Sequence, residues 1–129
     1  MQKAKIPTPT ESVEQQLLFR WAAWCENMYP GIELMHHIPN GGHRSKSEAG
    51  RFKAEGVKPG IPDIFLPVAR GKHHGLYIEL KRTDGRATKA QLDMLAKLEA
   101  QGYCTVICYG FDAAKSAIIE YYTEIAGCE

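Results

Sequence analysis

The sequence predicts an α/β domain in which a mixed central sheet is flanked by helices. Three apolar runs, at residues 63–68, 76–81 and 103–110, have the length of strands. A loop of turn residues separates the first two runs and predicts a hairpin, whereas a helical pattern separates the last two and predicts a crossover between parallel strands. With the flanking patterns, the order of elements is α-β-α-β-β-α-β-α, which is typical of a mixed sheet covered by helices.

Length and composition indicate one globular domain. The chain has 129 residues and a net charge of +1, which is enough for one core and rules out a polycation. We expect a single domain over residues 1–129, with a loose segment at 1–8. No apolar run has the roughly 18 residues of a membrane span, and the N-terminus lacks the apolar core of a secretion signal. We therefore expect a cytoplasmic protein without a membrane partner. The four cysteines form no CxxC pair, which argues against a zinc ribbon.

The first helix is predicted from Pro9 to about Asn27. Thr8 fits the N-cap and Glu11 completes a capping box with it. Glu14 has no such local explanation, because it lies on the apolar side of the helix. At helical spacing it shares that side with Leu17, Leu18, Trp21 and Cys25. Glu14 is therefore expected to face the body of the protein.

The next segments are a strand, a turn and a short helix. Alternating apolar residues predict a strand over residues 32–39, with His36 on its apolar side and therefore in the core. The sequence "NGGHR" at 40–44 predicts a turn or loop. Ser45 and Glu48 fit a capping box at the start of a helix over 45–56.

The C-terminal half continues the alternation of strands and helices. Thr88 and Gln91 form a capping box at the start of a helix over about 88–101. The strand at 103–110 is apolar on both faces, so we expect it at the centre of the sheet. A last helix is expected over about 112–122.

Several polar residues fall where the pattern calls for apolar ones. In the strand at 76–81, Glu79 and Lys81 project from the same face, because side chains alternate along a strand. Asp63 begins the preceding strand and points away from its apolar face. If the two strands form a hairpin, Asp63 and Glu79 can approach each other. Gln91 lies on the inward side of its helix, and its spacing fits a cap and a functional role equally well.

Clustered carboxylates and a lysine allow two interpretations. Carboxylate oxygens suit a hard cation such as Mg²⁺ or Mn²⁺, which can polarise a phosphoryl group. A lysine on the same face can act on the attacking water or stabilise negative charge. Alternatively, Lys81 forms partly buried salt bridges with Glu79 or Asp63. The spacing alone does not decide between these interpretations.

Longer stretches of the chain resemble a known nuclease family. "PD" at 62–63 and "ELK" at 79–81 resemble the PD-(D/E)xK nuclease signature. The segments "IPNGGHRSKSEAGRFKAEGVKPGIPD", "GLYIELKR" and "KAQLDMLAKLEAQGY" make the chain similar to the stand-alone VRR-NUC domains of phages and bacteria. The resemblance covers nearly the whole chain. It implies a restriction-endonuclease-like fold and a location in the cytoplasm of a bacterial or phage-infected cell.

The resemblance also implies roles for individual residues. It implies that Mg²⁺ or Mn²⁺ is bound by Asp63, Glu79, the backbone carbonyl of Leu80 and, directly or through water, Glu14. Lys81 would act on the attacking water. Gln91 would help to position that water, the phosphate or Lys81.

The implied reaction is hydrolysis of DNA phosphodiester bonds by an endonuclease. Small members of the family are similar to Holliday-junction resolvases, so the resemblance implies branched DNA as substrate and a homodimer, whose symmetry suits a two-fold junction. Residues expected to contact DNA are Asn40, Gly41, Gly42, Arg44, Lys46 and Arg82. Two alternatives stay open, a non-cleaving DNA-binding module of the same fold and a flap or nicking nuclease.

Overall fold

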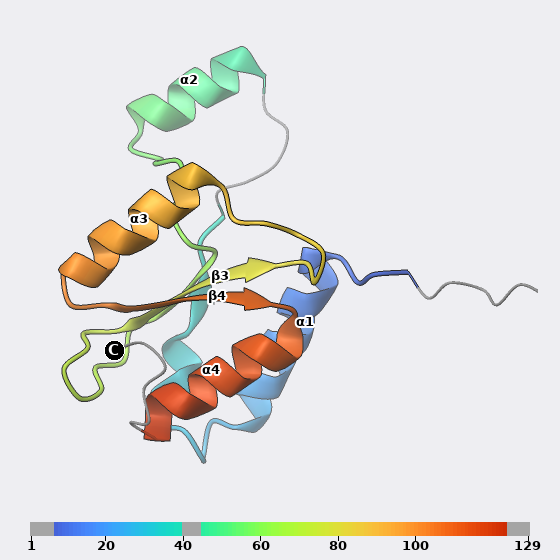
Figure 1. The fold of residues 1–129 in the computed structure, drawn as a ribbon, viewed down its shortest axis with the longest axis vertical. Helices are drawn as coiled ribbons and strands as arrows, with labels where there is room; N and C mark the ends of the chain where they lie inside the picture. Colours follow the sequence, from blue (N-terminus) through green and yellow to red (C-terminus); the bar gives the residue numbers. More distant parts are fainter. Residues whose placement is uncertain (1–6, 40–44, 124–129) are drawn as a thin grey trace, which may run out of the picture.

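A four-stranded mixed sheet forms the centre of the computed structural model, which describes residues 7–39 and 45–123 (Figure 1). Its strands lie in the order β1-β2-β3-β4. Their bounds are β1 His36–His37, β2 Ile64–Leu66, β3 Leu76–Lys81 and β4 Cys104–Tyr109. β2 pairs with its two neighbours in antiparallel fashion, and β3 pairs with β4 in parallel. The predicted α/β class and mixed sheet are therefore confirmed.

Helices cover both faces of this sheet. Their bounds are α1 Glu11–Trp24, α2 Lys46–Ala54, α3 Lys89–Ala100 and α4 Phe111–Thr123, with a 3₁₀ helix, η1, at Ile32–Leu34. α1 and α4 pack against each other on one face, and α3 packs on β4 from the other face. Among the described helices, none combines the length and apolarity needed to cross a membrane.

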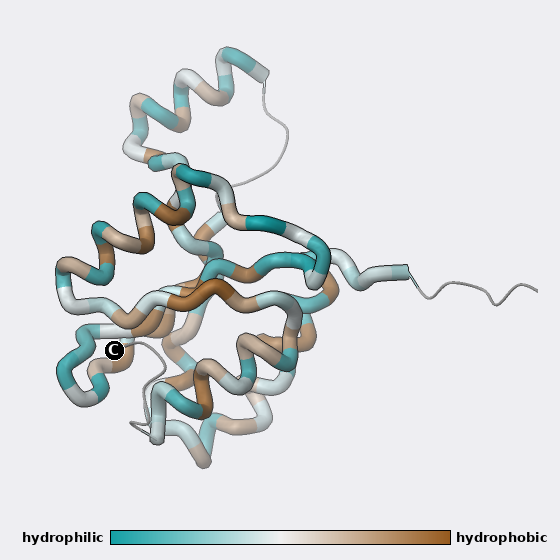
Figure 2. Tube along the Cα trace, viewed as in Figure 1, coloured by the Kyte–Doolittle hydropathy of each residue, from teal (hydrophilic) through white to brown (hydrophobic). Residues whose placement is uncertain are grey.

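The apolar face of β3 builds the main core. Ile78 and Leu80 are almost fully buried there, together with Leu18 of α1 and Ile118 of α4. Figure 2 shows a long hydrophobic stretch along β4, the neighbour of β3 in the sheet. The opposite face of β3 carries Glu79, so burying one strand face leaves the other free to hold polar groups.

The first helix begins two residues later than expected. The hydroxyl of Thr10, not Thr8, accepts a hydrogen bond from the backbone N–H of Val13, at 3.2 Å. Thr10 has extended backbone angles, as an N-cap requires, and Pro9 precedes the cap. The third helical position is then Val13, so Glu11 is not engaged in a capping box.

The strand expected over 32–39 is mostly not a strand. Residues 32–34 form η1, and only His36 and His37 pair with β2. Ile32 and Met35 are the buried residues, and their spacing of three is the period of a 3₁₀ helix rather than of a strand. His36 is exposed, so its assignment to the core was wrong.

β4 lies at the edge of the sheet, which corrects the expectation that it is central. Its two faces are apolar because α3 covers one and α4 covers the other, not because strands lie on both sides. Helix coverage therefore produces the same sequence pattern as a central position. The hairpin and the capping box of α3 are as predicted. At α2 only the Ser45 half of the predicted capping box is present, in which the hydroxyl of Ser45 accepts from the backbone N–H of Glu48.

Candidate metal centre

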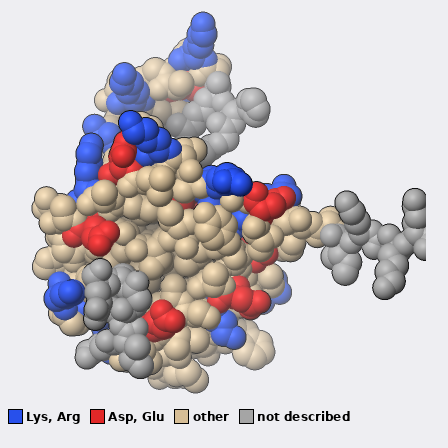
Figure 3. All heavy atoms as spheres, viewed as in Figure 1, with Lys and Arg blue, Asp and Glu red and all other residues tan. Residues whose placement is uncertain are grey.

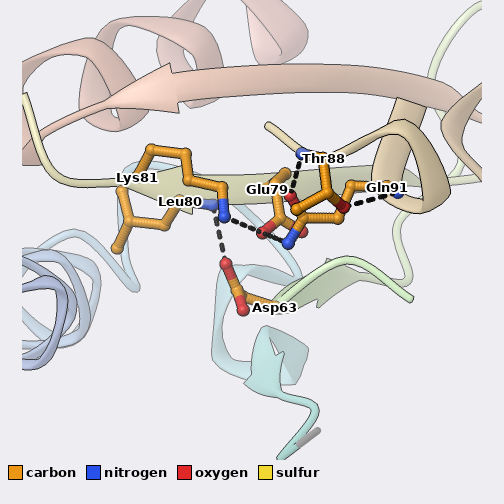
Figure 4. Close-up of polar contacts among 6 residues, drawn as sticks. All are labelled: Asp63, Glu79, Leu80, Lys81, Thr88 and Gln91. Atoms are coloured by element: carbon orange, nitrogen blue, oxygen red, sulfur yellow. Dashed lines mark hydrogen bonds and ion pairs between the residues drawn. The ribbon is translucent and has the colours of Figure 1, made fainter. Parts of the chain in front are cut away.

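Asp63 and Glu79 are brought together by the antiparallel pairing of β2 and β3. Ile64 is opposite Ile78, so the next step along the ladder places Asp63 opposite Glu79. Buried Pro62 leads into this position. One carboxylate oxygen of Asp63, Oδ2, accepts a hydrogen bond from the backbone N–H of Leu80 at 2.9 Å (Figure 4). The predicted approach of the two carboxylates follows from this register.

Glu79 is a carboxylate in an unusual environment. The residue is only 1% exposed. Burial is the main reason why its pKa rises to about 8, and the neighbouring Asp63 adds to the rise while Lys81 opposes it. Oxygen Oε1 has polar neighbours, whereas Oε2 is buried and lacks a hydrogen-bond partner among the described residues. A buried oxygen of this kind is costly unless a cation or a proton satisfies it.

Lys81 lies beside Glu79 on the same face of β3. Its ammonium nitrogen Nζ is 3.5 Å from Oε1 of Glu79. The salt bridge that the sequence left as an alternative therefore exists for this pair. It does not compete with a metal site, because it uses one oxygen of Glu79 and leaves the other without a partner among the residues that the structure describes. Figure 4 shows the lysine amine turned toward the carboxylate.

Gln91 caps its helix and also contacts Glu79, whereas its part in the reaction stays a prediction. Its carbonyl oxygen accepts a hydrogen bond from the backbone N–H of Thr88 at 2.8 Å, which completes the capping box. Its amide nitrogen Nε2 donates to Oε1 of Glu79 at 3.0 Å. Because each end of the amide has its own partner, the cap fixes the orientation of the group that holds Glu79.

The start of α3 is also held from the other side, by Gly60. A Cβ atom at Gly60 would lie 2.4 Å from the backbone oxygen of Ala90, and the residue has a φ of +81°. Only glycine fits such a contact in this backbone conformation. The connection that leads to Asp63 therefore rests directly on the helix that carries Gln91.

Glu14 is buried, as predicted, but its described partner lies at α4. Its oxygen Oε2 accepts a hydrogen bond from the backbone N–H of Phe111 at 2.5 Å, and its side chain is 7% exposed. A carboxylate at a helix N-terminus satisfies a free N–H and interacts favourably with the helix dipole. Within residues 7–39 and 45–123, no three His, Cys, Asp or Glu side chains form a metal-binding group. A metal-supporting role for Glu14 stays a prediction.

An open pocket of about 310 Å³ adjoins Asp63 and contains residues that sequence reasoning missed. Besides Asp63 and Leu80 it is lined by Glu11, Ser12, Gln15, His37 and Pro39. Glu11 and Gln15 are one helical turn apart, a spacing that puts both on the same side of α1. The assignment of Glu11 to a capping box with Thr8 accounted for this residue, so its position on the same side of the helix as Gln15 was not used. The carboxylate of α1 in the pocket beside Asp63 is thus Glu11.

The residues expected to contact DNA are only partly described. Asn40, Gly41, Gly42 and Arg44 lie outside the described residues. Lys46 is the exposed first residue of α2, and Arg82 follows β3 and forms an ion pair with Asp84 at 2.9 Å.

The donor set fits a hard divalent cation. Asp63 and Glu79 supply carboxylate oxygens from adjacent strands, and Oε2 of Glu79 has its bonding capacity unused by any described residue. Mg²⁺ and Mn²⁺ prefer such oxygen ligands and commonly retain water. These two residues would hold the ion. The ion pair with Lys81 leaves Oε2 of Glu79 without a described partner, so this oxygen is open to a cation or, because the pKa of Glu79 is raised to about 8, to a proton.

Comparisons with known proteins agree on one family. The family model of the VRR-NUC domain matches residues 10–112. A solved structure described as a VRR_NUC domain protein is similar to this chain, with a TM-score of 0.76 and 33% sequence identity over 92% of each chain. No curated protein matches the chain. A VRR-NUC match implies a nuclease-type fold with DNA as substrate and divalent-metal dependence in general.

Proposed function

The chain belongs to the VRR-NUC domain family, and we propose that it is a metal-dependent endonuclease that hydrolyses DNA phosphodiester bonds. The observation that carries the proposal is the buried Oε2 of Glu79, which lacks a described hydrogen-bond partner and belongs to a carboxylate paired across the ladder with Asp63. A purely structural ion pair does not require a second carboxylate at this position.

Each residue of the centre has a chemical task in this proposal. Asp63, Glu79 and the backbone carbonyl of Leu80 would hold Mg²⁺ or Mn²⁺, which supplies Lewis acidity and a lowered pKa of bound water. Lys81, whose ammonium lies beside Glu79, would orient the attacking water or stabilise charge on the phosphate. Gln91 keeps Glu79 in place through its hydrogen bond.

The third carboxylate of the centre has two candidates on α1. The family resemblance implies Glu14 as a metal-supporting residue, and the carboxylate of Glu14 accepts a hydrogen bond from the backbone N–H of Phe111. Glu11 lines the pocket that also contains Asp63. We favour Glu11 as the residue that contacts metal-bound water or the phosphate, with Glu14 fixing α4 against α1.

For the substrate and assembly, we propose branched DNA cut by a homodimer in the cytoplasm of a bacterial or phage-infected cell. The homodimer part of the proposal is supported by α1, where three apolar side chains are exposed at helical spacing. They are Val13, Leu17 and Trp24, the last of which is 87% exposed. A two-fold axis would place this stripe against its own copy.

The decisive experiment is a cleavage panel. Four-way junction, flap, duplex and single-stranded DNA are incubated with Mg²⁺ or Mn²⁺ and with wild type, Asp63→Ala or the matched surface variant Asp93→Ala. We expect cleavage by wild type and Asp93→Ala and its loss in Asp63→Ala. Equal cleavage by Asp63→Ala would contradict the metal centre.

The same panel separates the alternatives. Binding of DNA without cleavage by wild type would support the non-cleaving module. Faster cleavage of flap or nicked DNA than of four-way junctions would identify a flap or nicking nuclease instead of a resolvase. The mass of the free protein in solution tests the dimer. A monomeric mass together with a preference for linear single strands would refute the resolvase version.

A further inference from the structure

Helix α2 stands apart from the rest of the fold (Figure 1). It buries no residue, and only Phe52 is half-buried. An isolated helix of this length is marginal in water, and most helices gain their stability by packing an apolar face. α2 instead has local supports, a hydrogen bond from the N–H of Glu48 to Ser45 at 3.2 Å and the ion pair of Arg51 with Glu55 at 3.5 Å. Packing against the core of the domain therefore does not explain why this segment is a helix.

The charged residues of α2 are sorted onto two sides. The positions i, i+3, i+4 and i+7 of one side are Lys46, Ala49, Gly50 and Lys53, which we call the lysine face. The other side carries Glu48, Arg51 and Glu55. Arg51 is engaged by Glu55, whereas the two lysines have no ion pair with any residue in the described ranges. Figure 3 shows basic side chains projecting from this helix into solvent.

Gly50 adds an observation that is independent of charge. In the middle of a helix, glycine costs about 1 kcal/mol relative to alanine. A Cβ atom at Gly50 would meet no described atom within 4 Å, so packing inside the chain does not require glycine there. With Ala49 beside it, the centre of the lysine face lets an external surface come close to the helix backbone.

The spacing of the lysines indicates the shape of that surface. Seven residues of helix separate Lys46 from Lys53, about 10.5 Å along the axis. This exceeds the size of one phosphate and is comparable to the major groove of B-DNA, about 12 Å wide. Two unpaired cations flanking a small-residue centre therefore match the phosphate backbone of a duplex.

The base of α2 is attached to the metal centre. After α2 ends at Ala54, the chain passes Gly60, which contacts the backbone of Ala90 in α3, and reaches Asp63. A partner held by the lysine face is thus linked to the catalytic strand through a short connection, whose first part is exposed and whose second part is anchored by Gly60 and the buried Pro62. Because the helix does not cover the pocket beside Asp63, it adds contact area without blocking that site.

We propose that α2 is a DNA-binding arm whose lysine face contacts the phosphate backbone of duplex DNA beside the cleaved bond. The inference rests on the proposed nuclease function and deepens it, because it assigns part of the substrate affinity to a surface outside the metal centre. It also identifies Lys53, which sequence reasoning did not select.

The test measures binding separately from cleavage. Anisotropy of a labelled duplex is followed over a salt series without divalent ions, in an Asp63→Asn background that does not cut. We expect Lys46→Ala/Lys53→Ala to weaken binding and to reduce the slope of log Kobs against log salt by about 1.8, or about 0.9 for each phosphate that is no longer neutralised. With Asp63 intact and Mg²⁺ present, the same pair should raise KM and leave kcat unchanged.

A matched control removes two lysines elsewhere. Lys72→Ala/Lys97→Ala causes the same change in net charge, and both residues are exposed, Lys72 in the loop between β2 and β3 and Lys97 in α3. This control should bind with nearly the wild-type slope. Gly50→Leu should weaken binding without lowering the melting temperature, because leucine favours the helix but fills the space between the lysines.

The titration is repeated with a labelled single strand in place of the duplex. Three results would overturn the proposal: an unchanged slope in Lys46→Ala/Lys53→Ala, an equal loss of affinity in the control pair, or a loss of affinity for the single strand alone. The nuclease proposal fails by a different result, the absence of metal-dependent cleavage by wild type. Because the slope is measured with a variant that does not cut, the two failures are distinguishable.

Discussion

The buried carboxylate of Glu79 makes a prediction about stability and pH. Its pKa rises from 4.5 to about 8 on folding, chiefly through burial. Between these values the folded state binds more protons than the unfolded state, so the free energy of unfolding falls as pH rises. The stabilising contribution is complete below 4.5 and is lost as the pH passes about 8. Glu79→Gln removes the titrating group and keeps an oxygen that accepts from Gln91.

The size of the effect follows from the shift. A change of one pKa unit corresponds to about 1.4 kcal/mol, so the full shift corresponds to about 5 kcal/mol. Most of it, about 4 kcal/mol, should be lost between about pH 5 and about pH 8.5. Urea unfolding in EDTA measures the free energy of unfolding of wild type, Glu79→Gln and the exposed control Glu99→Gln at both values.

We expect wild type and Glu99→Gln to lose stability together as pH rises, and Glu79→Gln to lose about 4 kcal/mol less. At the higher pH, Mg²⁺ at about 100 times its Kd should restore about 2.7 kcal/mol to wild type but much less to Glu79→Gln. If all three proteins lose the same amount in EDTA, the carboxyl of Glu79 does not carry a raised pKa, and the reasoning about its unpartnered oxygen fails.

Three further substitutions test the surroundings of the centre. Glu14→Ala should destabilise the fold by about 1–2 kcal/mol, because the amide at the start of α4 loses its acceptor, whereas Glu11→Gln should leave thermal unfolding unchanged and slow cleavage. If Glu14→Ala loses cleavage but keeps its stability, Glu14 acts at the metal site and not as a structural acceptor for α4. Gly60→Ala should cost roughly 1–3 kcal/mol in urea unfolding and lower kcat, since the added methyl group pushes against the helix that carries Gln91. Wild-type stability and kcat in this variant would show that the close contact is not required.

Features that depend on near neighbours in the chain could be predicted well. The alternation in residues 76–81 placed Glu79 and Lys81 on one face, and the spacing of Thr88 and Gln91 gave the capping box. The turn-rich loop before residue 76 gave the hairpin and thereby the approach of Asp63 to Glu79. Each of these patterns has a local physical cause that few tertiary arrangements override.

Errors arose where two arrangements produce one pattern. An apolar strand covered by a helix on each face has the same composition as a central strand, which hid the edge position of β4. Likewise, buried residues at 32 and 35 fit a 3₁₀ helix, although the run through His36 alternates like a strand.

The sequence by itself determined the α/β class, the hairpin that pairs Asp63 with Glu79, and the face shared with Lys81, because local periodicity and turn chemistry fix them. Only the tertiary structure decided what each glutamate of α1 meets. Glu14 bonds to an amide 97 residues away, and Glu11 opens onto the pocket beside Asp63. The helical pattern shows which side of α1 faces inward, but the partner on that side depends on long-range packing.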